Sequence, residues 1–286
     1  MKKIAFIVNP ISGGSSSRKK RKILEEFARE KGMPVFITVR QGHAQEIAKS
    51  IKEEYDCLAV FGGDGTINEV ASELIHQSTE LAIIPAGSGN GLAWHLNIPI
   101  ETEQALGFLD RDARKIDTIQ INEQYIINVG GLGFDGHVAK LFNNSKSRGL
   151  LTYAWLIFTQ LISFKEQAFT VKLENQEFNG TAFMIAFANG SEFGNRFIID
   201  PQGRANDGKF SLVIIRKPPW LKLIPLLMDG FKGKLKESEF YKRYPTESLV
   251  ISSPGATLHR DGEVSQESMP NELRLQILPG SLNLIF

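Results

Sequence analysis

Apolar and polar residues alternate along the first hundred or so residues in a way that predicts strands and helices in turn. Short apolar runs predict buried strands, and apolar residues three or four positions apart predict helices between them. In chain order these elements are strand 4–8, helix 17–31, strand 34–39, helix 44–54, strand 58–61, helix 67–75, strand 81–84 and a helix after Asn90. This alternation predicts a parallel sheet covered on both faces, with its strand-to-helix loops at one ligand-binding edge.

The pattern changes after about residue 112, where short strand-like runs dominate. They are 115–121, 125–129, 169–173, 183–188, 210–214, 248–251, 273–277 and 282–285, interrupted by helical stretches near 150–163 and 219–231. Such runs predict a mainly antiparallel second domain. We therefore expect domains 1–120 and 121–286, and the pattern leaves open whether the C-terminal tail returns to the first domain.

Composition limits the classes of protein that fit. A chain of 286 residues fits two globular domains. Its formal net charge of +1 implies no strong electrostatic field that would attract nucleic acid. The single cysteine, Cys57, lies in an apolar run and predicts a buried side chain rather than a disulfide framework. The N-terminus begins a strand rather than a signal peptide, and the apolar stretch 150–164 is too short and polar to span a bilayer. A cytoplasmic location follows as an expectation.

The most informative stretch is residues 61–69, Phe-Gly-Gly-Asp-Gly-Thr-Ile-Asn-Glu, between a predicted strand and a predicted helix. Backbone N–H groups in such a turn, with a helix N-terminus behind them, favour phosphate. Asp64 would repel phosphate unless a cation stood between them. The turn therefore predicts a site for a Mg²⁺-nucleotide.

Three further strand-end loops have the composition of ligand-binding loops. They are Asn9 to Gly14, Thr38 to Ala44, and Pro85 to Gly91, and each could also be a plain turn. Carboxylates beside glycine follow in the second half at Asp135, Asp207, Asp261 and Glu263. An Asp-Gly pair is by default a hairpin turn, but a carboxylate in a cleft can act as a general base in phosphoryl transfer.

In their order, these motifs resemble the diacylglycerol kinase catalytic-domain family, which includes bacterial lipid kinases, sphingosine kinases and ceramide kinases. The matching motifs run from residue 3 almost to the C-terminus: Asn9-Pro10, Ser12-Gly13, Gly62 to Thr66 with Asn68-Glu69, the Gly-Ser-Gly-Asn loop at 87–90, Gly133 to Asp135, Asn206 to Gly208 and Asp261 to Glu263. The resemblance implies an NAD-kinase-like α/β domain joined to a β-sandwich domain, with ATP and Mg²⁺ in the cleft.

The resemblance also implies a role for each motif residue. ATP would be lined by Asn9, Pro10, Ser12, Gly13, Thr38, Gly62, Gly63, Asp64, Gly65, Thr66, Asn68, Glu69, Gly87, Ser88 and Asn90. Glu263 would be the catalytic base with Asp261 beside it, and Asp64 would organise the catalytic Mg²⁺. Asp207, with the main-chain carbonyls of Arg204 and Lys209, would hold a structural Mg²⁺, and Asp135 would join a network to the catalytic metal.

Departures from the family pattern bear on the substrate. Gly91 and Trp94 stand where bacterial diacylglycerol kinases carry Asp and Arg, and Gly14 replaces a common lysine, so the third loop is closer to sphingosine and ceramide kinases. The apolar stretches 150–158 and 219–228 are candidate lipid walls or membrane-contact faces, or else ordinary core helices. Trp220 and Lys222 would suit a membrane interface.

The sequence thus predicts an ATP-dependent lipid kinase that phosphorylates a hydroxyl of a diacylglycerol- or sphingoid-like lipid in lipid metabolism. Two alternatives stay open: a kinase of a soluble polyol or nucleotide, and a non-catalytic nucleotide or lipid sensor. A lipid partner and transient membrane contact are expected, no nucleic acid is, and a homodimer is left open.

Overall fold

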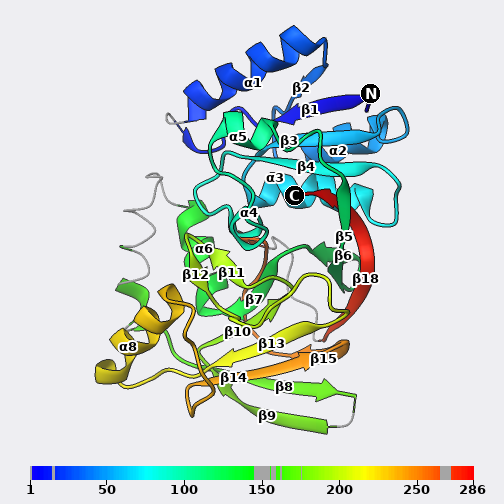
Figure 1. Cartoon of the computed structure of the whole chain (residues 1–286). Helices are drawn as coiled ribbons and strands as arrows, with labels where there is room; N and C mark the ends of the chain where they lie inside the picture. The colour runs from blue at the N-terminus through cyan, green and yellow to red at the C-terminus, as the bar shows by residue number, and fades with distance from the viewer. Residues whose placement is uncertain are drawn as a thin grey trace. The chain divides into compact units, whose positions relative to one another are not determined.

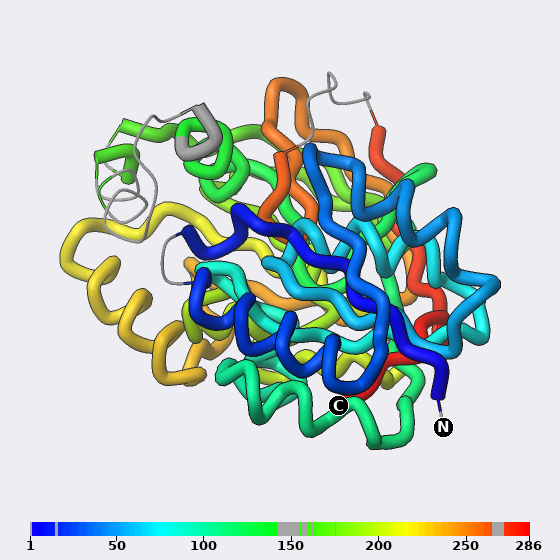
Figure 2. Tube along the Cα trace, turned by 90° about the horizontal axis from the view of Figure 1, so that it is seen from above, coloured from blue at the N-terminus to red at the C-terminus, as the bar shows by residue number. Residues whose placement is uncertain are grey.

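The computed structural model describes residues 2–14, 17–144, 155, 159–161, 163–174, 176–264 and 272–286. The chain divides into two compact units. Unit 1 comprises residues 1–118 and 279–286, and unit 2 comprises residues 119–278. Figure 2 follows the chain from its blue N-terminus to the red C-terminal segment, which ends among the elements of unit 1.

Unit 1 is an α/β domain with a mainly parallel sheet (Figure 1). Its elements are β1 (Ile4–Val8), α1 (Ser17–Lys31), β2 (Val35–Ile37), α2 (His43–Ile51), β3 (Cys57–Gly62), α3 (Asp64–Leu74), β4 (Glu80–Pro85), α4 (Gly91–His95), α5 (Thr102–Leu106) and most of β5 (Ala113–Ile121). The strands follow the order β2-β1-β3-β4, all parallel. The strand after β4 is the last part of β18, which pairs parallel with it at Leu284 and Ile285.

The alternation of side chains along β1 and β3 explains how both faces of this sheet are buried. Ile4, Phe6 and Val8 share one apolar cluster with Leu24 and Ala28 of α1 and with α5. The residues between them, Ala5 and Ile7, are fully buried on the other face, where α2 and α3 pack together. Parallel strands buried on both faces need continuous apolar sequence, which is what the chain supplies here.

Unit 2 is an antiparallel β-sandwich. Its elements are β6 (Gln124–Ile126), β7 (Val129–Gly133), α6 (Phe134–Asn144), β8 (Gln167–Leu173), β9 (Gln176–Ala182), β10 (Met184–Ala188), β11 (Glu192–Gly194), β12 (Phe197–Ile198), β13 (Phe210–Ile215), α8 (Trp220–Phe231), β14 (Tyr241–Thr246), β15 (Ser248–Ser252), β16 (Leu258–Arg260), β17 (Glu263–Val264) and the first part of β18 (Leu273–Ile285). One sheet has the order β14-β13-β10-β7-β16-β17. The strands β18, β15, β8 and β9 form the facing layer, paired antiparallel.

The sandwich core lies between these two layers. Val171, Ile251 and Leu275 contribute from one layer, and Phe187 and Leu212 from the other, within one cluster of buried side chains. Alternate residues along each strand face this cluster, as expected for packed antiparallel sheets.

The structure differs from the predicted elements in three ways. The strand expected at 125–129 is two strands, β6 and β7, because Ile126 pairs in one sheet and Val129 in the other. The strands expected at 273–277 and 282–285 form the single strand β18, whose Gly280 adopts a left-handed φ of 56°. Helices α5 and α6 and strands β9, β11, β12, β14, β16 and β17 were not predicted, and most of the helix expected near 150–163 lies outside the described residues.

Candidate functional site

Three glycine turns of unit 1 meet at the carboxyl ends of β1, β3 and β4. A Cβ atom added to Gly87 would lie 2.6 Å from Cα of Gly63, and one added to Gly13 would collide with the main-chain oxygen of Ala86. Gly13 also has a φ of 71°, in the left-handed region that favours glycine. Close backbone packing therefore requires glycine at these positions, and it brings residues 9–14, 62–66 and 85–90 together.

Polar side chains tie the first two turns to each other. Asn9 donates from Nδ2 to Oγ1 of Thr66 at 2.9 Å, and its Oδ1 accepts the N–H of Ile11 at 3.2 Å. The N–H of Asn9 donates to the carbonyl of Phe61, also at 2.9 Å. Pro10 and Ser12 are half-buried in the same turn. Thr66 is thus oriented from outside its own helix, in the first turn of α3.

Asp64 opens α3, where the first N–H groups of a helix have no partner within it. Its Oδ1 accepts the N–H of Leu92 at 3.4 Å, so the carboxylate also faces the start of α4. Asn90, next to that start, is buried with a φ of 51° and donates from Nδ2 to the carbonyl of Gly87 at 2.8 Å. The Oδ1 atom of Asn90 is buried without a hydrogen bond among the described residues. Asn68 lies one turn further along α3 and is buried, whereas Ser88 is exposed.

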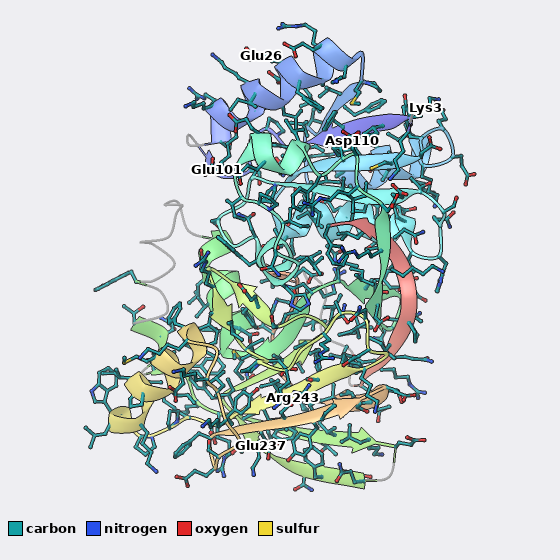
Figure 3. The ribbon with its side chains drawn as sticks, viewed as in Figure 1. Lys3, Glu26, Glu101, Asp110, Glu237 and Arg243 are labelled. Carbon is teal, nitrogen blue, oxygen red and sulfur yellow. The ribbon has the colours of Figure 1, made fainter. Side chains whose placement is uncertain are left out.

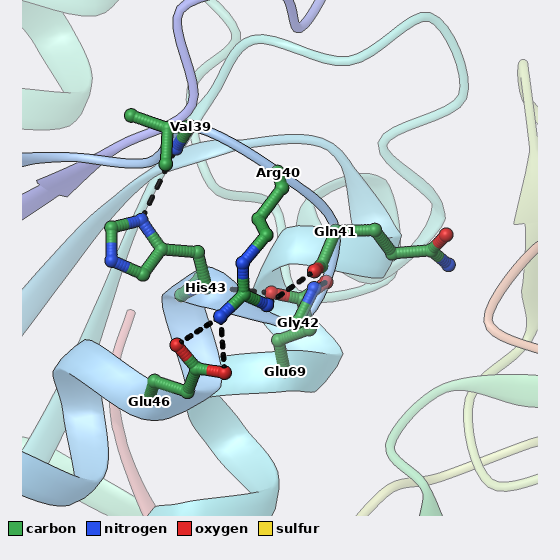
Figure 4. A network of polar contacts seen from close by, with 8 residues as sticks. Val39, Arg40, Gln41, Gly42, His43, Glu46 and Glu69 are labelled. Carbon is green, nitrogen blue, oxygen red and sulfur yellow. Dashed lines mark hydrogen bonds and ion pairs between the residues drawn. The ribbon is translucent and has the colours of Figure 1, made fainter.

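Thr38 begins a loop held by a network of polar contacts (Figure 4). Its side chain is buried, and its N–H donates to the carbonyl of Val8 at 2.9 Å. Glu69 accepts the N–H groups of Gly42 and Ala44 at 2.8 and 3.1 Å, one on each carboxylate oxygen. We therefore read Glu69, expected among the ATP residues, as a side chain that holds this loop and the start of α2.

The rest of this network is exposed. Arg40 contacts both carboxylate oxygens of Glu46, and this hydrogen bonding lowers the pKa of the Glu46 carboxyl. Nδ1 of His43 accepts the N–H of Val39 at 3.1 Å. Both contacts fix the loop that follows β2 without adding a reactive group to it.

In unit 2, Asp261 is a buried carboxylate surrounded by backbone N–H groups. Its Oδ2 accepts from Ile127 at 2.9 Å, and its Oδ1 accepts from Asn128 and Val129 at 2.8 and 3.0 Å. The residue has a φ of 47° and is 7% exposed. Because three donors already occupy these oxygens, Asp261 joins the end of β16 to the start of β7 and is poorly placed to take a proton.

Glu263 lies two residues further on, in β17, and is half-buried. It stands opposite Arg260 in the β16–β17 pair, and Gly262 with a φ of 83° forms the turn between them. Of the two acidic residues in this motif, Glu263 is therefore the one whose side chain is partly open to solvent.

Beside this turn is a buried pair that the sequence did not reveal. Nε2 of His259 contacts Oδ2 of Asp135, although the two residues are 124 positions apart. His259 is 2% and Asp135 6% exposed, and a Cβ atom on Gly131 would lie 2.7 Å from Oδ2 of Asp135. The pair links the start of α6 to β16, so the carboxylate of Asp135, which was expected in a metal network, contacts a histidine.

Asp207 forms a local turn. Its Oδ1 accepts the N–H of Lys209 at 3.2 Å, Gly208 has a φ of 75°, and Arg204, Asp207 and Lys209 are all exposed. Among the described residues, no three side chains of His, Cys, Asp or Glu gather in a metal-binding group. A cation at this turn would therefore depend on main-chain carbonyls and one carboxylate, an oxygen set of the kind that Mg²⁺ accepts.

Comparisons with known proteins agree with this architecture. The family model described as "Diacylglycerol kinase catalytic domain" matches residues 3–121. The family model described as "YegS C-terminal NAD kinase beta sandwich-like domain" matches residues 128–286. A Pseudomonas aeruginosa protein named "Probable lipid kinase YegS-like" is 30% identical over 259 residues, covering 88% of this chain and 84% of that protein. A Bacillus subtilis diacylglycerol kinase is 28% identical over 276 residues, covering 92% of this chain and 90% of that protein.

A solved structure gives the same fold. The crystal structure of a diacylglycerol kinase from Bacillus anthracis superposes with a TM-score of 0.75 at 20% identity, covering all of this chain and 97% of that one. The N-terminal α/β domain and the C-terminal sandwich predicted from sequence are confirmed by the structure and by these matches. The chain therefore belongs to the diacylglycerol kinase catalytic-domain family, in the form that carries a YegS-type C-terminal sandwich.

Proposed function

We propose that this chain transfers the γ-phosphoryl group of ATP to a hydroxyl of a diacylglycerol- or sphingoid-like lipid. Family membership supports a lipid kinase. The observation that carries the proposal is the packing of three glycine turns around Asp64 at one edge of the unit 1 sheet, with Gly63 and Gly87 backbone to backbone. This arrangement presents backbone donors and one carboxylate to a ligand, as a Mg²⁺-triphosphate requires.

Each turn has a role in this proposal. The N–H groups at the start of α3 and the positive end of its dipole hold phosphate oxygens, and Asn9 keeps Thr66 oriented toward them. Asp64 is the metal-organising carboxylate. A Mg²⁺ ion held there would offset the negative charge that develops during phosphoryl transfer. The exposed apolar side chains of Ile11 and Val39, 83% and 79% exposed, follow adjacent strands and are suited to contact a purine ring.

We assign the base to Glu263 rather than Asp261, because the Asp261 oxygens accept three backbone N–H groups. The Glu263 carboxylate takes the proton of the lipid hydroxyl as the hydroxyl oxygen bonds to the γ-phosphorus. The bond from that phosphorus to the bridging oxygen breaks, and ADP leaves with the electron pair. His259 and Asp135 then act as positioning residues for the end of β16, which leads into this motif. The Asp207 turn, with the carbonyls of Arg204 and Lys209, stays a proposed structural Mg²⁺ site.

The test is incubation of the purified protein with Mg²⁺-ATP and a panel of diacylglycerols, sphingoid bases and long-chain alcohols, followed by mass spectrometry. We expect one class to gain a phosphoryl group, and Glu263→Gln to retain ATP binding while product formation is lost. Glu272→Gln is the matched control, since Glu272 is an exposed acid outside the motif and should leave turnover unchanged. Full activity in Glu263→Gln would remove the proposed base.

A second candidate acceptor is a soluble nucleotide. The NAD-kinase-like sandwich of unit 2 is the reason to test it. The same assay with NAD in place of lipid decides between them. Phosphorylated NAD without lipid product would replace the lipid proposal, and ATP binding without any turnover would indicate a nucleotide sensor.

A further inference from the structure

Helix α8 carries an apolar stripe that faces solvent. Five large side chains of this helix are exposed: Trp220 (53%), Leu221 (87%), Ile224 (54%), Met228 (48%) and Phe231 (60%). At 100° per residue they fall within about 100° of one another around the helix axis. They therefore form one continuous strip along the whole length of α8, which we call the outer stripe.

A different face of α8 provides most of its packing on unit 2; within the outer stripe, the Phe231 ring meets that of Phe197 edge-on, with the ring centroids 5.3 Å apart. Leu223 is buried in a cluster with Phe134 and Phe183. At Gly230 an added Cβ would collide with the ring of Phe197, so the helix approaches β12 closely there. The helix is thus apolar both toward the unit and away from it, with Lys222 and Asp229 as its only charged residues. A helix that needed only to cover a core would be polar on its outer face.

Basic residues lie at both ends of the helix. Arg216 and Lys217 come just before it, and Lys232, Lys234 and Lys236 follow it. Across residues 216–239 the chain has six basic and three acidic residues, and one of those acids, Glu239, pairs with Lys222 at 2.8 Å. Among the described residues, none forms an ion pair with Arg216, Lys232, Lys234 or Lys236.

We propose that α8 is a membrane-docking helix that lies flat in the interface of an anionic bilayer, with the outer stripe among the acyl chains. An apolar strip with cations at its two ends is the arrangement that interfacial helices use, since lysine heads reach the phosphates while aromatic and aliphatic groups enter the boundary. No helix in the described part of the chain is long and apolar enough to cross a bilayer. The proposal deepens the proposed function, because it says how the protein would reach a lipid substrate.

Charge favours a bilayer over a second copy of this chain. In a two-fold contact through the outer stripe, the lysines beyond Phe231 would approach those of the other copy or the segment before Trp220, which is also positive. Like charges brought together in this way oppose association, whereas an anionic surface attracts every one of them.

The test is cosedimentation of the full chain with vesicles of mixed phosphatidylcholine and phosphatidylglycerol, without nucleotide. The variant Leu221→Glu/Ile224→Glu removes two exposed apolar side chains, and each should weaken partitioning by about tenfold or more. Ile37→Glu is the matched control, because it makes the same kind of change at an exposed apolar residue of unit 1 that has no part in the proposed site. Circular dichroism melting checks that all variants are folded.

We expect the wild type, Ile37→Glu and Glu263→Gln to bind mixed vesicles, and the α8 variant to lose binding by about a hundredfold. Binding to the mixed vesicles should weaken as salt is added, and binding to vesicles of pure phosphatidylcholine should be weaker than to the mixed ones. Equal binding by the α8 variant, or none by the wild type, would overturn the proposal without touching the kinase assignment. A dimer in solution that the α8 variant abolishes, with no vesicle binding, would also overturn it and would make the outer stripe a self-association face.

Discussion

Asp261 and Glu263 are separated by one glycine, and replacing each with its amide should give opposite results. Asp261→Asn keeps the size and the left-handed φ of 47°, which asparagine tolerates. It also replaces one acceptor oxygen with an NH₂ group. One of the N–H groups of Ile127, Asn128 and Val129 then faces a donor inside the protein, and the other bonds lose their charge assistance.

The cost can be estimated from these bonds. A buried donor left without an acceptor costs about 1–3 kcal/mol, and weakening the remaining charged bonds adds about 1 kcal/mol. We therefore expect Asp261→Asn to destabilise unit 2 by about 2–4 kcal/mol. In a unit of this size that lowers the melting temperature by about 4–16 °C. Asp261→Ala should cost more, since all three N–H groups lose their acceptor and alanine is disfavoured at this φ.

The assay is thermal unfolding of both amide variants followed by calorimetry, with kinase activity measured well below the transition. Glu263 is half-buried in a short strand. The free energy of unfolding of Glu263→Gln should therefore lie within about 0.5 kcal/mol of the wild-type value, while its turnover is lost. If Asp261→Asn melted like the wild type and yet abolished activity, Asp261 would be the reacting group and the structural reading would be wrong.

Three further predictions follow from buried groups and close contacts. Gly87→Ala should weaken ATP binding by tenfold or more in equilibrium binding, because the new Cβ would lie 2.6 Å from Gly63 and separate two turns; unchanged affinity would contradict the site. Burial raises the pKa of the Cys57 thiol to about 12, so only about one thiol in ten thousand is ionised near pH 8. Alkylation should therefore follow unfolding, and rapid labelling of the native protein would refute this. Burial raises the pKa of the Glu192 carboxyl, and the positive charge of Arg196 partly offsets this rise. The folded state therefore favours the protonated carboxyl. Stability from Glu192 is then full below its unfolded pKa and declines as pH rises through the raised value. Glu192→Gln should gain stability over the wild type between about pH 4 and pH 8, and a constant difference in melting temperature across that range would count against this.

Much of unit 1 could be predicted because its strands are buried on both faces and read as continuous apolar runs. Strand Ile4–Val8 and helix Ser17–Lys31 have the expected bounds. Unit 2 was harder, since strands such as Tyr241–Thr246 are largely polar and expose two of their six residues. Helix α6 was missed because it begins directly after the glycine-rich strand β7, where the sequence favours a turn.

The site divides in the same way. Glycine turns after strands are local in sequence, so the loops at 9–14, 62–66 and 85–90 could be anticipated. The His259–Asp135 pair and the three N–H groups around Asp261 depend on contacts more than 120 residues apart. No local pattern signals which backbone a carboxylate will meet at that separation. The exposure of the outer stripe likewise required the structure, because its sequence fits a core helix equally well.

Strand β18 has a consequence for how the chain folds during synthesis. Its residues Leu284 and Ile285 pair with β4, about 200 positions earlier, and the hydroxyls of Ser281 and Thr118 lie 2.8 Å apart. A nascent polypeptide that has not yet emerged past residue 279 therefore leaves β4 as an open edge, ready to pair with a neighbouring chain. The edge of β4 stays unpaired while unit 2 is translated. During this interval a chaperone could bind the nascent chain and prevent its association with another chain.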